Sequence, residues 1–359
     1  MASLPGVEPS EQITPAELRL ATRNHGMPLE ALAYDVTPAG LHYLLIHYDI
    51  PVVDGEAWRL SVGGSVARSL SLSLADLRAR PSVTRAVTME CAGNGRARLS
   101  PRPISQPWLL EAVGTAEWTG VPLRDLLLEA GVDDSAIEVR FRGLDRGVEG
   151  GEAQSYERAL PVEDAMRDEV LLAWGMNGAP LQPQHGFPLR LVVPGWYGMT
   201  SVKWLSEITV SADPFEGYQQ VRGYRLRQTP DEPGEPVTRM VVRSLMIPPG
   251  VPDFATRERL VEVGPCVVRG RAWSGLGAVA GVEVSVDGGV SWRPARLGPS
   301  VSPWAWRSWE FEWDAAEPGD YELCCRASDA AGNVQPLEAP WNLGGYANNA
   351  VHRVPVRVG

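Results

Sequence analysis

One stretch of the sequence combines a thiol, a tight turn and fixed positive charge. Cys91 follows the β-leaning run 86–89, precedes the turn Gly93-Asn94-Gly95, and is followed by Arg96 and Arg98. Glycine and asparagine tolerate the positive φ that such turns require. Positive charge lowers a thiol pKa from roughly 8.5 and favours the thiolate, a nucleophile or soft metal ligand. The alternative is a small buried hydrophobe, as most free cysteines are.

A second stretch gathers hydrogen-bond donors around an apolar run. His185, Arg190, Ser201 and Lys203 surround residues 189–193 within glycine-rich loops, and Lys203 is the only lysine of the chain. Such donors, with glycines that let the backbone approach closely, suit a phosphate or another oxyanion. The stretch contains neither a Walker loop nor a Gly-x-Gly-x-x-Gly fingerprint. It favours an anionic cofactor, with a turn-rich α/β connection as the alternative.

A third group of candidates lies near the N-terminus. The loop Thr22-Arg23-Asn24-His25 is rich in donors, lacks acidic residues, and reads equally well as an anion cradle or a surface loop. His42 and His47 fall on a predicted strand at 41–50. Neither has a second metal-binding partner nearby, so we interpret both histidines as structural.

These candidates need a scaffold, and the sequence predicts a chain of class α+β. Strands alternate with helices in the first part, which indicates a mixed α/β domain. The proline-rich stretch 228–236 resembles a linker, and the short strands after it suggest an immunoglobulin-like β-sandwich. We therefore predict a catalytic domain at 1–235 and a sandwich at 236–359. The predicted strands lie at 58–63, 137–142, 170–174 and 189–193, with helices at 119–127 and from residue 160.

Composition excludes several classes of partner. The 359 residues carry a formal net charge of −11, which argues against nucleic acid and anionic membranes as partners. The four cysteines form no zinc or haem-attachment motif. We find no signal peptide and no stretch of transmembrane length. The expectation is a cytoplasmic protein with reduced thiols.

Several motifs, taken in order, resemble the sulfite oxidase family of molybdenum enzymes in its form without a haem domain. The motifs are Cys91-Ala-Gly-Asn94, His185-Gly-Phe-Pro-Leu-Arg190, Ser201-Val-Lys203-Trp204 and Ser285-Val-Asp-Gly-Gly289. The resemblance implies a molybdenum–molybdopterin cofactor, with Cys91 as the metal ligand, and no haem. It also implies that the sandwich domain forms a homodimer.

The resemblance assigns the remaining site residues. Arg23 and Arg96 would line an oxyanion pocket, and Tyr224 would orient the substrate. The residues that would bind the pterin and its phosphate are Thr22, Arg23, Asn24, His25, Asp145, His185, Arg190, Ser201, Val202 and Lys203. The implied reaction is oxidation of sulfite to sulfate by oxygen-atom transfer, with electrons passed to an external acceptor such as a cytochrome c or a small molecule.

Two features depart from the family pattern. The family carries arginine in Trp-Asn-Xaa-Arg-Gly near its end, whereas this chain has Gly344 at that position. Arg222 or Arg225 replacing the missing charge is a hypothesis. Tyr224 follows Gly223 instead of an acidic residue, which keeps Tyr218 as the alternative pocket tyrosine.

Two other functions stay open at this point. A reductase of the same fold, acting on an oxyanion such as nitrate or on a sulfoxide, is compatible with Gly344 and with Asn348-Asn349. A non-catalytic binding protein is the second alternative. It predicts that no molybdenum is bound and that Cys91→Ser changes nothing.

Overall fold

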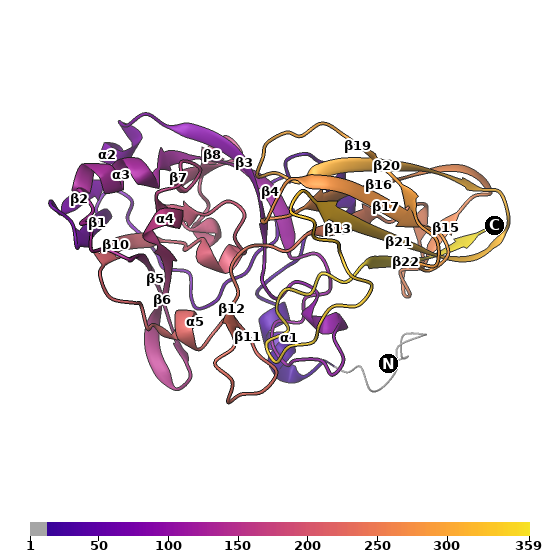
Figure 1. Cartoon of the computed structure of the whole chain (residues 1–359), viewed down its shortest axis with the longest axis horizontal. Helices are drawn as coiled ribbons and strands as arrows, with labels where there is room; N and C mark the ends of the chain where they lie inside the picture. The colour runs from indigo at the N-terminus through magenta and orange to yellow at the C-terminus, as the bar shows by residue number, and fades with distance from the viewer. Residues whose placement is uncertain (1–12) are drawn as a thin grey trace.

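The computed structural model describes residues 13–359, and its first part contains two five-stranded sheets (Figure 1). One sheet has the order β2-β1-β10-β5-β6, and the other has the order β3-β4-β7-β8 with β9 paired to β7. The strands of the first sheet are β1 (Arg59–Gly64), β2 (Leu70–Ser73), β5 (Glu138–Glu149), β6 (Glu152–Pro161) and β10 (Leu205–Ser211). Those of the second are β3 (Val83–Glu90), β4 (Val113–Pro122), β7 (Leu171–Met176), β8 (Ala179–Pro180) and β9 (Arg190–Val192).

Short helices connect these strands. The α-helices are α1 (Pro15–Ala21), α2 (Leu74–Arg78), α3 (Leu123–Ala130), α4 (Val162–Ala165) and α5 (Tyr218–Val221). Helix α3 buries Leu123, Leu126, Leu127 and Ala130, a spacing that puts all four on one helix face. It begins four residues later than predicted, because residues 119–122 continue β4 and pair with β3 and β7.

The strand predicted at 41–50 is wrong. Only Leu44 pairs with another backbone segment, in a bridge to His25. The carbonyls of Leu45 and Tyr48 instead accept hydrogen bonds from the side chains of Lys203 and Arg23. This segment is therefore an extended loop whose backbone is held by the donors of the site.

The C-terminal part is a β-sandwich, which confirms the predicted fold class. Its two sheets have the orders β13-β16-β20-β19 and β14-β15-β22-β21-β17-β18. On β20, Trp309, Phe311 and Trp313 alternate with more exposed residues and face the core. The strands are β13 (Arg243–Ile247), β14 (Val251–Pro252), β15 (Arg259–Val261), β16 (Gly264–Trp273), β17 (Val279–Ser285), β18 (Arg293–Pro294), β19 (Arg296–Leu297), β20 (Arg307–Ala315), β21 (Gly319–Asp329) and β22 (His352–Val358).

A short pair of strands, β11 (Arg225–Leu226) and β12 (Glu235–Pro236), lies in the connection between the two parts. The boundary at 235/236 stays a prediction, and residues 1–12 of the predicted first domain lie outside the described residues. Among residues 13–359, no helix is both long and apolar enough to cross a membrane.

The two parts are joined at the end of β3 (Figure 1). Glu90, the last residue of β3, forms a 2.7 Å ion pair with Arg243 of the sandwich, and both side chains are almost fully buried. The indole Nε1 of Trp273 donates to the same carboxylate at 2.9 Å. After β21, the chain returns to the first part, where Asn348 donates to the carbonyl of Gly95 at 2.7 Å. The sandwich thus holds the strand and the loop on either side of Cys91.

Candidate functional site

Cys91 lies at the turn where β3 ends. Its backbone N–H donates to the carbonyl of Ala112, and its carbonyl accepts from Asn94 N–H, both at 2.9 Å. Gly95 has a φ of 90°, which explains the need for glycine there. The Asn94 side chain donates to Glu90 and accepts from the backbone of Ala112. These bonds fix the turn, so the position of the thiol is set by the sheet.

The electrostatic environment of Cys91 differs from the expectation. Burial raises the pKa of the Cys91 thiol, and the nearby charge of Arg96 lowers it only in part. The side chain is 8% exposed, because the returning segment after β21 covers the turn. A thiolate at this position therefore calls for a stronger cation than Arg96, such as a metal ion.

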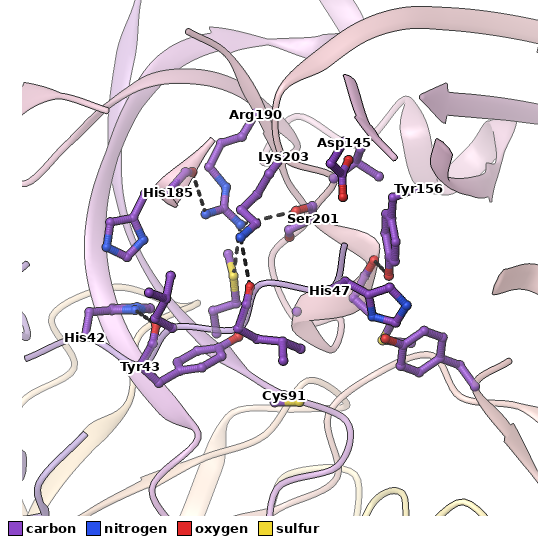
Figure 2. Close-up of a pocket in the computed structure, with 17 residues that line it drawn as sticks. His42, Tyr43, His47, Cys91, Asp145, Tyr156, His185, Arg190, Ser201 and Lys203 are labelled. Atoms are coloured by element: carbon purple, nitrogen blue, oxygen red, sulfur yellow. Dashed lines mark hydrogen bonds between the residues drawn. The ribbon is translucent and has the colours of Figure 1, made fainter. Parts of the chain in front are cut away.

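Cys91 lines a cavity of the first part of the chain. In Figure 2, the Cys91 sulfur lies across the cavity from Arg190 and Lys203. The predicted site residues that line the cavity are Cys91, Asp145, His185, Arg190, Ser201, Val202, Lys203 and Tyr224. The structure thus brings together predicted residues that lie far apart in the sequence, from Cys91 to Tyr224.

The donors of the second stretch form one cluster on the cavity wall (Figure 2). Arg190 on β9 donates to the carbonyls of His185 at 3.1 Å and Ser201 at 3.2 Å, and its guanidinium lies 4.5 Å from the ring centroid of Trp118. The Lys203 ammonium donates to the carbonyls of Leu45 and Gln184. Both cations are held by neutral carbonyls, so their charges are left for another partner.

The cluster has an excess of positive charge. Burial lowers the pKa of Arg190 to about 10 and that of Lys203 to about 7, and the charge of Arg190 lowers the Lys203 value further. Within residues 13–359, neither side chain forms an ion pair with a carboxylate within 4 Å. Burial also raises the pKa of the nearby Asp145 to about 6, against the effect of Lys203. An anionic ligand would relieve this imbalance.

Two buried polar atoms of the cavity lack a hydrogen-bond partner within the described part of the chain. They are Nε2 of His42 and Oδ1 of Asp145. Burial lowers the pKa of His42 to about 4, so its ring is neutral at pH 7. Buried polar atoms are almost always paired, and unpaired ones on a cavity wall indicate an unseen polar ligand. The donor set and the unpaired atoms together fit an anionic group that carries further polar atoms.

The N-terminal loop lies outside the residues that line the cavity. Thr22, Arg23 and His25 are exposed, and Arg23 donates to the carbonyl of Tyr48 at 2.6 Å. Asn24 is buried and accepts from the backbone of Ile46. This loop shapes segment 41–50, which itself forms one wall of the cavity. Direct cofactor binding by Thr22, Arg23, Asn24 and His25 stays a prediction.

The two candidate pocket tyrosines differ in their position relative to the cavity. Tyr224 lines the cavity and is 8% exposed, whereas Tyr218 does not line it. Tyr224 has a φ of 51°, which is strained for a tyrosine and typical of functional sites. The role of Tyr224 stays a prediction.

The arginines considered as sources of positive charge for the oxyanion pocket do not line the cavity. Arg96 does not line the cavity, and its Nε donates to the carbonyl of Gly344 at 2.8 Å. Arg222 is exposed, and the Arg225 guanidinium donates to the carbonyls of Pro233 and Gly234. The hypothesis that Arg222 or Arg225 supplies a pocket charge therefore receives no support from their placement.

Sequence reasoning missed several residues of the cavity. His42 and His47 line it, although we interpreted both as structural, and Tyr156 was not considered. The Nε2 atom of His47 lies 2.9 Å from the Glu149 carboxylate, and its ring packs against Tyr156. The histidines reach the cavity because segment 41–50 is a loop instead of a strand. Tyr156 belongs to no motif that sequence reasoning could have used.

Two family models match the chain. A model described as oxidoreductase molybdopterin binding domain matches residues 47–219, and one described as Mo-co oxidoreductase dimerisation domain matches residues 236–359. The first range contains Cys91 and the donor cluster.

Known proteins are similar over most of the chain. Sulfite oxidase of Gallus gallus is 40% identical over 347 residues, covering 91% of this chain and 74% of that protein. Mitochondrial sulfite oxidase of Mus musculus is 39% identical, covering 90% of this chain, and the chain spans 62% of that protein's length. Nitrate reductase [NAD(P)H] of Hordeum vulgare is 33% identical, over 90% of this chain and 39% of that protein.

A solved structure is similar as well. The sulfane dehydrogenase SoxCD of Paracoccus pantotrophus matches with a TM-score of 0.81 and 28% identity. The match covers 96% of this chain and 86% of that one. Both sheets of the first part and the sandwich thus have a counterpart in one known protein.

Proposed function

Because the chain belongs to the sulfite oxidase family of molybdopterin oxidoreductases, we propose that it oxidises sulfite to sulfate and passes two electrons to an external acceptor. One observation carries the proposal: the Cys91 thiol and the cationic cluster of Arg190 and Lys203 face each other across one cavity. A thiol suits a soft metal, and the cluster suits the phosphate of the cofactor that would carry that metal.

The residues present fit a molybdopterin. Arg190, Lys203 and Ser201 would hold its phosphate, and the unpaired atoms of His42 and Asp145 would bind polar edges of the pterin. Residues 13–359 contain no group of three or more His, Cys, Asp or Glu side chains placed to hold a metal ion. Cys91 would thus share the metal with sulfur atoms of the cofactor. When bound, the molybdenum cofactor supplies oxygen-atom transfer and two-electron redox chemistry.

The protein contributes placement and charge. Burial holds the pKa of Tyr224 well above its ordinary value, so its hydroxyl keeps the proton that it would donate to a bound oxyanion. Tyr156 is fixed next to it, because its hydroxyl donates to the carbonyl of Met199 at 2.8 Å. Both phenols lie on the same cavity as Cys91, where Tyr224 would orient an oxyanion beside the metal and Tyr156, whose proton is donated to Met199, would hold Tyr224 in position.

Sulfite-dependent reduction of ferricyanide tests the proposal. Protein with measured molybdenum and pterin contents is compared with its Cys91→Ser variant. We expect saturable turnover in the parent protein. In the variant, turnover falls at least about 100-fold because the thiolate ligand is lost, while pterin is retained by the phosphate cluster. Equal turnover in both proteins would exclude Cys91 as the metal ligand.

Nitrate reduction is the second candidate, because the barley nitrate reductase matches 90% of this chain. The same molybdenum-loaded preparation is supplied with a chemically reduced viologen and nitrate. We expect nitrite formation to be much slower than sulfite oxidation. Rapid nitrite formation without sulfite-dependent turnover would make the reductase the better assignment.

A further inference from the structure

We propose that a row of four side chains, Arg158–Tyr224–Tyr346–Arg96, recognises the divalent oxyanion substrate, with Arg158 supplying a second cation and Tyr346 holding Arg96 in place. The inference rests on the proposed function, which gives the substrate class. It goes beyond that function by naming two residues, Arg158 and Tyr346, that the sequence motifs do not contain.

The row is continuous. The Arg158 guanidinium carbon lies 5.6 Å from the ring centroid of Tyr224, and the rings of Tyr224 and Tyr346 are 5.3 Å apart. The Arg96 guanidinium carbon lies 5.1 Å from the Tyr346 ring centroid. Tyrosine faces attract cations, so each arginine is held by the ring beside it. The four residues come from β6, the segment after α5, the segment after β21 and the cysteine turn.

Both arginines are buried cations without a carboxylate partner. Arg158 is 2% exposed and Arg96 is 6% exposed, and neither forms an ion pair in the part of the chain that the structure describes. Arg158 donates to the carbonyl of Gln219, and its Nε has no hydrogen-bond partner. Two other buried arginines, Arg243 and Arg271, each pair with a carboxylate within 2.7 Å. Because burying an unpaired charge is costly, Arg158 and Arg96 are suited to a ligand that brings negative charge.

The row reaches the cavity through its tyrosines. Tyr224 lines the cavity together with Cys91 and Tyr156. Tyr156 and Arg158 are two positions apart on β6, so both point to the same face of the sheet. The charge of Arg158 is therefore placed beside the ring of Tyr224, the phenol that would donate to the oxyanion.

Tyr346 explains why no cation stands at position 344. A Cβ on Gly344 would lie 2.2 Å from the Tyr346 ring, so the ring occupies the space that a side chain at 344 would need. The ring covers Arg96, whose Nε donates to the Gly344 carbonyl. With position 344 closed to a side chain, the second cation comes from Arg158 on the neighbouring strand.

Arg158→Met tests the cation, with Arg158→Lys as its conservative partner. Arg259→Met is the control for burial, because Arg259 is also buried and donates to the carbonyls of residues 248–250. Unlike Arg158, it also forms a 3.7 Å ion pair, with Glu30. In molybdenum-loaded Arg158→Met, we expect KM for sulfite to rise about 10- to 100-fold with a smaller change in kcat. Arg158→Lys restores most of the affinity, and Arg259→Met leaves KM unchanged.

Tyr346→Leu tests the aromatic contact, with Tyr346→Phe as its conservative partner. Removing the ring frees Arg96, so KM for sulfite rises about 3- to 10-fold, whereas phenylalanine keeps the ring and restores most of the affinity. If Arg158→Met fails to fold, the KM values of Tyr346→Leu and Tyr346→Phe still test the inference.

A second readout does not depend on turnover. Sulfate, added as a probe to the molybdenum-loaded proteins, raises Tm by binding the folded state. We expect this rise in the parent protein and in Arg259→Met, and its loss in Arg158→Met. An Arg158-dependent rise in a parent protein that does not oxidise sulfite would support the anion site and reject the proposed function. Unchanged KM and an unchanged sulfate-dependent rise in Arg158→Met would overturn the inference, as would a parental KM in Tyr346→Leu if Arg158→Met does not fold.

Discussion

At the scale of single residues, the folded protein disfavours the protonated, charged form of Lys203. Burial and the neighbouring Arg190 lower its pKa from the ordinary 10.5 to about 7. Its ammonium is held by two carbonyls and lies 4.4 Å from the Trp204 ring centroid, with no carboxylate within ion-pair distance among residues 13–359. A phosphate beside it would favour the charged form and so couple cofactor binding to proton uptake.

The pKa of Lys203 predicts the pH dependence of apoprotein stability. Between pH 7 and 10.5, the unfolded chain holds a proton that the folded apoprotein has released, so the free energy of unfolding rises with pH. The rise is at most about 1.4 kcal/mol per pH unit. Urea unfolding of the apoprotein at several pH values measures it, and Lys203→Met should remove this part of the slope. Identical slopes in both proteins would contradict the assigned pKa.

The structure brings several residues of the short motifs to one cavity, while their roles stay predictions. Cys91, Arg190 and Lys203 were found because thiol, guanidinium and ammonium groups stand beside turns and glycines. Arg158 and Tyr346 could not be found in this way. Arg158 lies in no motif and Tyr346 directly follows the stretch 341–345, and only the packing of β6 and of the segment after β21 brings the two residues to Tyr224.

At the scale of elements, β3 sets the position of the thiol, and its end is held from the sandwich. Glu90 accepts hydrogen bonds from Asn94, Arg243 and Trp273, so one carboxylate joins the cysteine turn to β13 and β16. The segment 41–50 shows why elements were harder to predict than residues. Its apolar residues resemble a strand, but its carbonyls are taken by Lys203 and Arg23.

Glu90→Gln should therefore destabilise the protein by about 3–5 kcal/mol, because it leaves Arg243 buried without its counter-charge. Urea unfolding measures the change. Glu283→Gln, which removes an exposed partner of Arg326, is the control and should cost less than about 1 kcal/mol. A Glu90→Gln variant as stable as Glu283→Gln would show that this ion pair does not hold β3 to the sandwich.

At the scale of the whole molecule, the residues that line the cavity all come from the first part of the chain, whereas residues of the C-terminal part pack against the cysteine turn beside it. Tyr346 and Gly344 reach the cysteine turn from the C-terminal part, after β21. The two-part architecture could be predicted, because alternating helices and strands give way to short strands. The way in which the C-terminal part completes the site could not, because it depends on long-range packing. The homodimer stays a prediction, in keeping with the dimerisation model that matches residues 236–359.

One measurement tests the central claim most directly: the amount of sulfate formed in a single anaerobic turnover without an electron acceptor. Molybdenum-loaded protein is mixed with excess sulfite, and sulfate is quantified by ion chromatography. Two-electron oxygen-atom transfer predicts about one sulfate per molybdenum and none in protein lacking the metal. No sulfate above the background in fully loaded protein would contradict sulfite oxidation as the function of this site.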